Sequence, residues 1–460
     1  MPTRKVDLYL SLFLLGILAL TFGGHGTTVD ENLVAQVVES MATRGELNCA
    51  QMFQALPGPD GKYYSRYGIG FPLMILPFYY LGDSFQWLKP DSRAYCGSPH
   101  MFAMLWASVL ITVLTGWSFY RLCLQLGGDA RVAALFALGL ILASPFWPYS
   151  QTLYRLNASG AIVILLLLSL LTYERTHSRL CLWAVAGLTA FGLNVREDLV
   201  FAFVAIGIWI CLRGAFSERW PRAAALMTGA VFGALIWGLH NYIRFRTFFI
   251  ENYEDLSFQE SLLTSVPQLL WGLRRGLIVY APLSLMPVFS FFAARRKGAV
   301  DLWLLCVGVL WVYLILYGKS SMWHGGVCWG PRHMYFLLPF AMLPGIWLFV
   351  DRPRLGWKIF FAAAFLWGVV VNWPGIYAYQ GKYQSFLESP SFFPLLMKPV
   401  EHPIYVAFDD LDLWWVRMMK LNPFSLWPVL FFGLLGLTAF WGYRLMQELK
   451  KPVQPIIETK

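Results

Sequence analysis

The chain has 460 residues, of which 58% are hydrophobic, 17% are aromatic and only 13% are charged. This composition excludes an ordinary soluble globular protein and is typical of a polytopic membrane protein. The formal net charge of +10 is accounted for by basic residues at the ends of membrane spans and by contact with anionic lipids. It therefore does not indicate a nucleic-acid-binding surface.

Apolar stretches follow one another along most of the chain. A span needs roughly 20 mostly apolar residues, and about twelve stretches qualify, with a range of about eleven to thirteen. They start near Leu8, Met101, Val132, Ala161, Leu180, Leu199, Ala223, Gly276, Val300, Met334, Ile359 and Phe424. We therefore predict an all-α polytopic membrane protein that forms a single integral-membrane domain over residues 1–460.

Basic residues give the orientation of these spans. Arg4 and Lys5 precede the first span, and the tail from Arg444 follows the last. Because Lys and Arg near span ends stay on the cytoplasmic side, both termini are predicted to be cytoplasmic. The first apolar segment lacks a typical small-residue cleavage site, so it is interpreted as a retained span and not as a signal peptide.

This orientation places four segments on the non-cytoplasmic side: 23–100, 241–275, 319–333 and 372–422. The first of them begins with a predicted helix, because Thr28 and Glu31 have the spacing of a capping box and Gly45 marks an end. Its apolar stripe predicts a helix lying along the membrane surface; the stripe comprises Leu33, Val34, Val37, Val38 and Met41. The stretch 67–81 contains two prolines and predicts a second interfacial or re-entrant helix.

Asp30 and Glu31 form an acidic pair close to the end of the first span. Carboxylates are favoured in the first turn of a helix, so one interpretation is that both residues only cap it. A carboxylate held against a membrane and facing cationic loops can also take a proton from an attacking hydroxyl. We favour this second interpretation and predict that Asp30 and Glu31 are catalytic.

Cationic and aromatic residues supply candidates for substrate binding. Arg332 follows a Gly- and Pro-rich turn that begins at Trp323 and His324, and a guanidinium matches phosphate oxygens bidentately. Lys62, Tyr63 and Arg66, with Tyr67 close by, form a basic and aromatic cluster that suits a sugar phosphate, although a solvated loop would look similar. Arg244 flanks the second outer segment. The run 196–198 is interpreted as a local salt-bridged reversal.

Cysteine and histidine positions add little to this set. Cys49 and Cys96 both fall in the first outer segment, where a disulfide and two free thiols are equally acceptable interpretations. Six of the seven histidines fall on or near the outer face, but no pair has tight ligand spacing on one helix. No cofactor is expected, and a divalent metal is kept as the alternative.

Taken in order, these segments resemble the C-type glycosyltransferases, the GT-C superfamily of integral-membrane enzymes that take a sugar from a polyprenyl-phosphate carrier. The likeness is to the group of protein mannosyltransferases and aminoarabinose transferases. The segments that carry it are Asp30-Glu31, 64–67 before Gly70-Phe71-Pro72-Leu73, Arg196-Glu197, Asn241-Tyr242, Arg244-Phe245, Gly276-Leu277 to Ala281-Pro282, and Trp323 to Arg332.

The resemblance implies a GT-C fold with Asp30 as the catalytic base and Glu31 as its neighbour. It also implies a polyprenyl-phosphate sugar as donor, with a glycan, a lipid or a protein as acceptor. The acceptor hydroxyl would attack the anomeric carbon with inversion, while Arg332, Lys62 and Arg66 stabilise the departing phosphate. The expected location is the inner (plasma) membrane, with a periplasmic active site.

Two alternatives remain open at this stage. A transporter, or flippase, of a lipid-linked sugar would share the hydrophobic composition, but it would place polar residues at mid-membrane and show internal repeats. A polysaccharide polymerase or ligase would instead use arginines and a histidine of a later outer loop, such as Arg244, Arg275 and His240. Only the transferase interpretation depends on Asp30.

Overall fold

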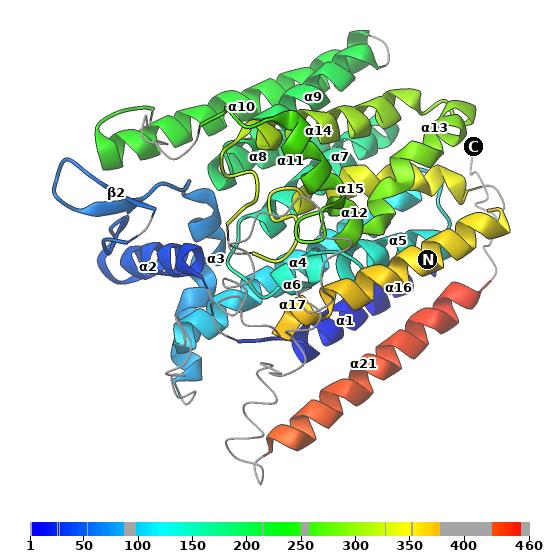
Figure 1. Cartoon of the computed structure of the whole chain (residues 1–460), viewed down its shortest axis with the longest axis horizontal. Coiled ribbons are helices and arrows are strands. Elements are labelled where there is room, and N and C mark those ends of the chain that lie inside the picture. The colour runs from blue at the N-terminus through cyan, green and yellow to red at the C-terminus, as the bar shows by residue number, and fades with distance from the viewer. Residues whose placement is uncertain are drawn as a thin grey trace.

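The computed structural model describes residues 2–451 except 25, 27, 53, 87–97, 214–215, 250–256, 327, 351–352 and 378–425. The described elements are almost all helices (Figure 1). The α-helices are α1 (Pro2–Leu20), α2 (Val29–Arg44), α3 (Gly70–Leu81), α4 (Pro99–Gln125), α5 (Ala130–Leu142), α6 (Phe146–Tyr149), α7 (Leu156–Thr176), α8 (Arg179–Val195), α9 (Leu199–Leu212), α10 (Phe216–Phe245), α11 (Leu262–Trp271), α12 (Leu277–Tyr280), α13 (Met286–Arg296), α14 (Val300–Lys319), α15 (Leu338–Met342), α16 (Leu355–Asn372), α17 (Pro374–Tyr377) and α21 (Trp427–Lys450). The 3-10 helices are η1 (Gly82–Phe85), η2 (Pro282–Leu285), η3 (Tyr335–Leu337) and η4 (Leu343–Leu348), and the strands are β1 (Asn48–Cys49), β2 (Ala55–Pro57) and β3 (Tyr63–Ser65).

Within the described ranges, 6 helices are long and apolar enough to cross a membrane: Pro99–Gln125, Leu156–Thr176, Ser217–Phe245, Val300–Lys319, Leu355–Ile376 and Trp427–Lys450. The chain is therefore a multi-pass membrane protein, and the larger number of about twelve spans stays a prediction. The apolar stretches that start near Gly276 and Met334 are divided into short α and 3-10 pieces. Prolines at 282, 287, 339 and 344 explain the division, because each lacks an N–H and clashes with the preceding turn.

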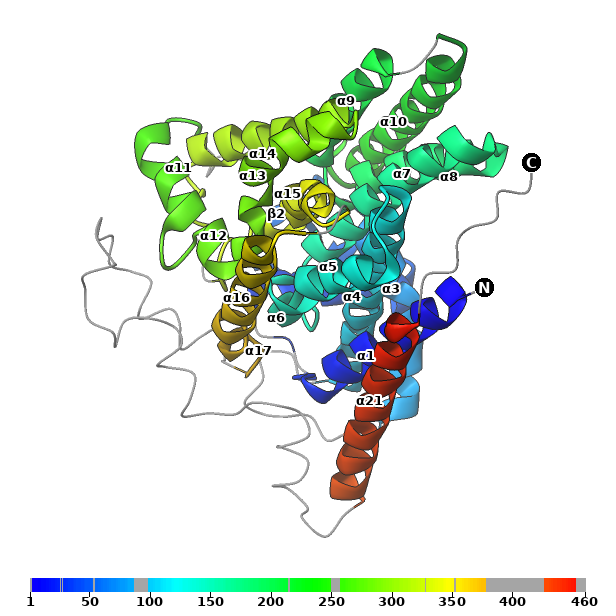
Figure 2. The ribbon, with the colours of Figure 1, turned by 90° about the vertical axis from the view of Figure 1, so that its right-hand side faces the viewer.

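The helices form a bundle around α4. This helix packs against α1, α3, α5 and α7, whereas α10 runs along α8, and α21 runs along α1 (Figures 1 and 2). Phe119 and Tyr120 of α4 are fully buried in the resulting core. The outward sides of α10 and α21 carry exposed large apolar side chains, for example Phe232 and Phe432. Such faces are expected where a helix meets lipid instead of protein.

Helix α2 begins and ends where the sequence predicts. Thr28 is the N-cap, the capping box with Glu31 is formed in both directions, and Gly45 follows the helix in the left-handed conformation. The apolar stripe is buried within the protein, and the position of the helix along the membrane surface stays a prediction. Leu33 and Val38 are fully buried, α2 packs against α3, and Val34 and Val38 belong to the protein core. A one-sided apolar helix is equally suited to lipid and to a neighbouring helix, so its pattern alone does not choose between them.

A small sheet, which the sequence did not predict, lies between α2 and α3. Its strands are antiparallel in the order β1-β3-β2, with Asn48 opposite Tyr64 on one side and Leu56 opposite Tyr64 on the other. Each strand has 2 or 3 residues. Strands this short are invisible to a search for alternating hydrophobicity, which needs roughly four to eight residues.

Helix α3 starts in close contact with the end of α8. A Cβ on Gly70 would lie 2.7 Å from the carbonyl carbon of Asn194, and one on Gly68 would lie 2.3 Å from the Asn194 oxygen. Only glycine permits backbones to approach this closely. The contact brings the loop before α3 against residues 194–198. In Figure 1 this loop, α2 and the sheet lie at one end of the molecule, and the N-terminus and the end of α21 lie at the other.

Two sequence predictions concern residues outside the described ranges. Cys96 is one of these residues, so its pairing with Cys49 stays a prediction. Of the outer segment 372–422, residues 378–422 are not described, and neither are residues 250–256 of the segment 241–275.

Candidate active site

The acidic pair divides into two different environments. Glu31 is fully buried and belongs to the scaffold, because its Oε2 accepts hydrogen bonds from the backbone N and the hydroxyl of Thr28, both at 3.0 Å. Its Oε1 accepts from the backbone N of Leu153, also at 3.0 Å. Glu31 therefore fastens the start of α2 to the loop between α6 and α7, while the neighbouring Asp30 turns toward other partners.

Both oxygens of Asp30 are engaged by side chains from distant parts of the chain. The Tyr67 hydroxyl donates to Oδ1 at 2.8 Å, and Arg332 donates from Nη2 to Oδ2. The Asp30 side chain is 10% exposed and that of Arg332 is 17% exposed. Burial alone would raise the pKa of Asp30, but the charge and hydrogen bond of Arg332, with smaller help from Tyr67 and Arg155, lower it. The carboxylate is therefore ionised at neutral pH.

Arg332 sits on a turn that the sequence predicted. Gly325, Gly326 and Gly330 all have positive φ values, from 55° to 74°, which L side chains rarely adopt. The guanidinium lies over the Tyr154 ring at 4.0 Å, and Nη1 is 3.4 Å from the Gly325 carbonyl oxygen. Its Nε is buried and has no hydrogen-bond partner among the described residues. Such an N–H is suited to an anionic oxygen.

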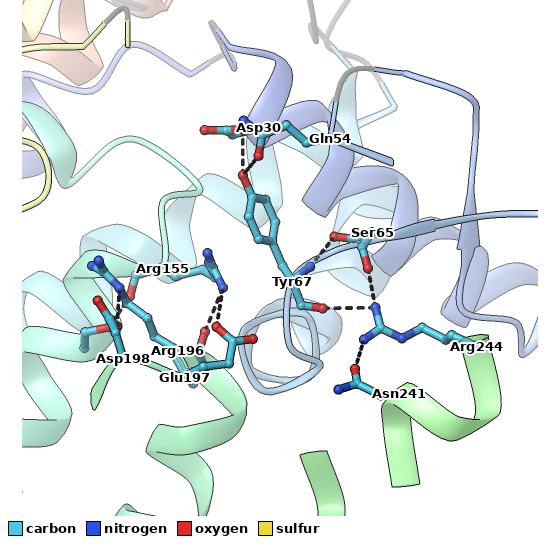
Figure 3. Close-up of polar contacts among 12 residues, drawn as sticks. Asp30, Gln54, Ser65, Tyr67, Arg155, Arg196, Glu197, Asp198, Asn241 and Arg244 are labelled. Atoms are coloured by element: carbon cyan, nitrogen blue, oxygen red, sulfur yellow. Dashed lines mark hydrogen bonds and ion pairs between the residues drawn. The ribbon is translucent and has the colours of Figure 1, made fainter. Parts of the chain in front are cut away.

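Arg155 is a second cation at the site, and no sequence pattern predicts it. Its guanidinium stacks on the Tyr67 ring at 3.9 Å. In Figure 3 Arg155 lies to the left of Tyr67, whereas Ser65 and Arg244 lie to its right. Its ion pair with Glu197 is loose, at 3.6 Å, and the Glu197 side chain is 30% exposed. A pair of this kind gives up its cation more readily than a tight buried one. Arg155 directly precedes α7. A charged side chain at this position is normally interpreted as the end of a membrane span, so it does not stand out as a site residue.

Residues 196–198 hold themselves together, as predicted. Arg196 Nε and Asp198 Oδ1 are 2.7 Å apart, and Tyr317 bridges the same two side chains. The Tyr313 hydroxyl also donates to the Asp198 carbonyl oxygen at 2.6 Å. This cluster fixes the turn between α8 and α9 to α14, next to the loop that carries Arg332. Figure 3 shows Arg196, Asp198 and Arg155 on one side of Tyr67.

The other predicted binding residues occupy varied positions. Lys62 is exposed and pairs with Glu46 at 2.8 Å, Tyr63 lies in β3 opposite Cys49, and Arg66 is half-buried in the loop that follows. The Nδ1 atom of His324 accepts from the Gly326 backbone N at 3.1 Å, while burial lowers its pKa. Trp323 has an edge-on ring contact with His324. Their predicted roles in donor binding stay predictions.

Arg244 has a different environment from the one expected of a donor-binding residue. It is 2% exposed and donates to the backbone carbonyls of Ser65 and Tyr67, the latter at 3.2 Å. It also donates to the side chain of Asn241 at 2.7 Å (Figure 3). Of the predicted set, the structure thus brings Asp30 and Arg332 into direct contact, and it connects Arg244 to them through Tyr67.

Within the described residues there is no group of three or more His, Cys, Asp and Glu side chains that could hold a metal ion. His25 and His402 are outside the described ranges. The absence of a cofactor stays a prediction.

The chain shares its fold with a solved protein, ArnT from Cupriavidus metallidurans, whose crystal structure is described as bound to undecaprenyl phosphate. The two structures superpose with a TM-score of 0.54, covering 96% of this chain and 76% of that chain, at 13% sequence identity. No family model and no curated protein sequence matches the chain. At this level of identity the likeness establishes the ArnT-like fold, consistent with the GT-C fold expected from the sequence.

Proposed function

We propose that this protein is an inverting glycosyltransferase that moves a sugar from a polyprenyl-phosphate donor to an acceptor on the non-cytoplasmic side of the membrane. The observation that carries the proposal is the buried contact between Asp30 and Arg332, which joins a candidate base to a candidate phosphate ligand. The ArnT-like fold supports it, because the similar structure binds undecaprenyl phosphate.

In the proposed reaction Asp30 is the general base and Arg332 is the phosphate-binding cation. The acceptor O–H gives its proton to the Asp30 carboxylate, and its oxygen forms a bond with the anomeric carbon from the face opposite the phosphate. The bond from the anomeric carbon to the phosphate oxygen breaks, and its electron pair stays on the phosphate. The phosphate changes from a diester with one negative charge to a monoester with more, which is the charge that a guanidinium stabilises.

The resting contacts make this chemistry depend on the donor. With Arg332 bound to Oδ2 and Tyr67 bound to Oδ1, Asp30 has a lowered pKa and is a weak base. A donor phosphate competes with Asp30 for the guanidinium. Once Arg332 turns to the phosphate, the carboxylate loses the main influence that lowers its pKa, and its basicity rises. Arg155, which is only loosely paired, is the second cation that can reach the same anion.

The proposed orientation follows from the charge pattern and agrees with the arrangement of the ends. Cytoplasmic retention of Arg4 and Lys5 places the opposite end of the molecule outside. That opposite end carries α2 and the sheet, which build the candidate site (Figure 1). The active site would accordingly be periplasmic, in an inner-membrane protein with both termini inside.

The polymerase or ligase alternative receives less support from the geometry. It depended on Arg244, Arg275 and His240, yet the two arginines donate to backbone carbonyls, Arg244 to Ser65 and Tyr67 and Arg275 to Gly326 at 2.6 Å. His240 is 7% exposed, and its own carbonyl oxygen accepts from Arg244 at 3.2 Å. These hydrogen bonds make the two guanidinium groups part of the scaffold.

The test is sugar release or transfer from a panel of radiolabelled polyprenyl-phosphate sugars in membranes that contain wild type or Asp30→Asn at matched expression. We expect one donor to be used by the wild type and its turnover to fall by about 10²–10⁴-fold in the variant. Glu39→Gln is the control, because Glu39 is an exposed carboxylate on the same helix. Equal turnover in wild type and Asp30→Asn would remove Asp30 as the base. No turnover with any donor would favour the transporter.

A further inference from the structure

Tyr67 makes more contacts at the candidate site than its place in a loop would require. Its hydroxyl bonds to Asp30, its ring carries Arg155 on one face, and its backbone carbonyl accepts from Arg244 (Figure 3). A side chain fixed at its hydroxyl, its ring and its backbone has little freedom of its own. Tyr67 can therefore hold the Asp30 carboxylate, to which it is hydrogen-bonded, in a fixed position.

Gln54 is the second partner of the Tyr67 hydroxyl and helps to decide to which group the hydroxyl donates its proton. Its amide end lies within hydrogen-bond distance of the Tyr67 oxygen. A hydroxyl has a single proton, and an ionised carboxylate is a stronger acceptor than an amide. The proton therefore goes to Asp30. The structure places Oε1 of Gln54 against the Tyr67 oxygen, and a 180° rotation of the amide presents its NH2 group instead, so that the Tyr67 oxygen accepts from Gln54.

The backbone of Gln54 is strained. Its φ is +73°, in the left-handed region that favours glycine. Strain of this kind persists where the surrounding structure over-determines a residue, and it gathers at functional sites. A glycine at this position would relieve the strain but would remove the amide that faces Tyr67.

Arg244 fixes the loop that carries Tyr67. It is almost fully buried at the end of α10 and donates to the carbonyls on both sides of Arg66. Its other nitrogens donate to Asn241 and to the His240 carbonyl. The long helix α10 therefore fixes the position of the Tyr67 hydroxyl, although Tyr67 itself lies in a loop.

We infer that Tyr67 is a positioning residue for the proposed base: it holds one oxygen of Asp30 in place, with Gln54 directing its proton and Arg244 fixing its backbone. The inference rests on the proposed function and deepens it. When the donor phosphate takes Arg332 away from Asp30, the bond from Tyr67 keeps the carboxylate aimed at the acceptor. Without this bond, Asp30 would turn freely at the moment when it must accept a proton.

The first test is Tyr67→Phe, which keeps the ring under Arg155 and removes only the hydroxyl. With the donor that the wild type uses, we expect kcat to fall about tenfold or more, because a hydrogen bond to a charged group is lost. The KM for the donor should stay within about twofold, since Arg332 and Arg155 remain. The acidic limb of the pH–rate profile should move to higher pH, because Asp30 loses a donor that favours its ionised form.

Tyr64→Phe is the matched control. Tyr64 lies in the neighbouring strand β3 and is also buried, but its hydroxyl donates to Asp60 at 2.6 Å instead of Asp30. It should leave kcat and the pH profile unchanged. Folding of all variants is checked by size-exclusion chromatography and by thermal unfolding in detergent.

Gln54→Gly gives a second readout that a purely structural role would not produce. Relief of the left-handed strain should keep or raise the thermal unfolding temperature, while kcat falls several-fold through loss of the amide. A fall in kcat that parallels a fall in stability would contradict the inference.

The outcomes separate the inference from the proposed function. If the wild type transfers sugar, Asp30→Asn is inactive and Tyr67→Phe keeps both the wild-type kcat and the wild-type pH profile, the positioning role is overturned and the transferase function stands. If the wild type uses no donor, the function itself fails, and the role of Tyr67 fails with it. A loss in Tyr67→Phe confined to KM would also overturn the positioning role, because it would place the hydroxyl on the donor.

Discussion

Replacement of Asp30 by Asn is expected to abolish transfer and, at the same time, to strengthen the binding of polyprenyl phosphate. In the resting site the Asp30 carboxylate occupies the Nη2 atom of Arg332. A lipid phosphate must displace the Asp30 carboxylate from the guanidinium, and it must also come close to this carboxylate, which carries a charge of the same sign. Asparagine keeps the shape of the side chain but removes its charge, so both obstacles become smaller.

The size of the effect follows from the geometry of the pair. Two unit charges about 4 Å apart interact by about 4 kcal/mol at an effective dielectric constant of about 20. An asparagine oxygen can still accept from the guanidinium, which retains about 1 kcal/mol. The side chains are 10% and 17% exposed, so water screens part of the remainder. A net gain of about 1.5–2 kcal/mol is left, which corresponds to roughly ten- to thirtyfold tighter binding.

The assay is a titration of purified wild type, Asp30→Asn and Glu39→Gln with polyprenyl phosphate in detergent, followed by thermal unfolding or by intrinsic tryptophan fluorescence. Glu39→Gln removes an exposed carboxylate from the same helix, so it controls for the change in net charge. The Kd of the control should stay within about twofold of the wild type, because exposed charges are screened. If Asp30→Asn binds the lipid no better than the wild type does, Asp30 and the phosphate do not compete for Arg332, and the proposed exchange is wrong.

Three further predictions concern the scaffold and the ionisation of the site. The folded-state pKa of Asp30 is lowered, so the stability contributed by its ion pair is complete above the unfolded-state pKa of about 3.9 and is lost only as the pH falls through the lower folded-state pKa. The difference in unfolding temperature between wild type and Asp30→Asn should therefore be constant from about pH 7 to 5 and change only below about pH 4. A change already complete by about pH 5 would be inconsistent with a lowered pKa. Glu31→Gln should destabilise the protein by about 1–3 kcal/mol. Glutamine keeps one acceptor oxygen, so either the Thr28 donors or the Leu153 N–H would face its NH2 group and lose their acceptor. An unaltered melting curve would argue against this anchoring role. Gly70→Ala should lower the yield of folded protein, because its Cβ would lie 2.7 Å from backbone atoms of Asn194 and Val195. Gly187→Ala, whose Cβ meets nothing within 4 Å, should be neutral or stabilising. Equal behaviour of the two variants in size-exclusion chromatography would show that the contact between α3 and α8 tolerates a methyl group.

Local patterns in the sequence predicted local structure well. Thr28, Glu31 and Gly45 gave the start and end of α2 because a cap is formed by residues within a few positions of one another. The glycines near Arg332 predicted a turn for the same reason. The acidic pair was found as a candidate from its place just past the first span, facing cationic outer segments, and Arg332 was found from the Gly- and Pro-rich turn before it.

Contacts between distant residues could not be predicted in this way. Tyr67 meets Asp30 from 37 positions away, and Arg155 reaches Tyr67 from another helix boundary. Arg244 looked like a substrate ligand because a basic residue at a membrane boundary has the same pattern whether it faces a ligand or backbone carbonyls. The apolar stripe of α2 was equally ambiguous, since lipid and protein bury the same side chains. In each case the choice depends on packing between helices, which one-dimensional periodicity does not contain.

The separation of Asp30 and Arg332 along the chain has a consequence for the assembly of the protein. The two residues are 302 positions apart, and all but the last of the helices that qualify as spans by length begin before or soon after Arg332. A chain that is still being inserted into the membrane therefore carries the proposed base without the proposed phosphate-binding residue. Under the proposed function, catalytic competence would arise late, when the turn that carries Arg332 meets Asp30 of α2, and a half-inserted chain would hold Asp30 but could not discharge lipid-linked sugar.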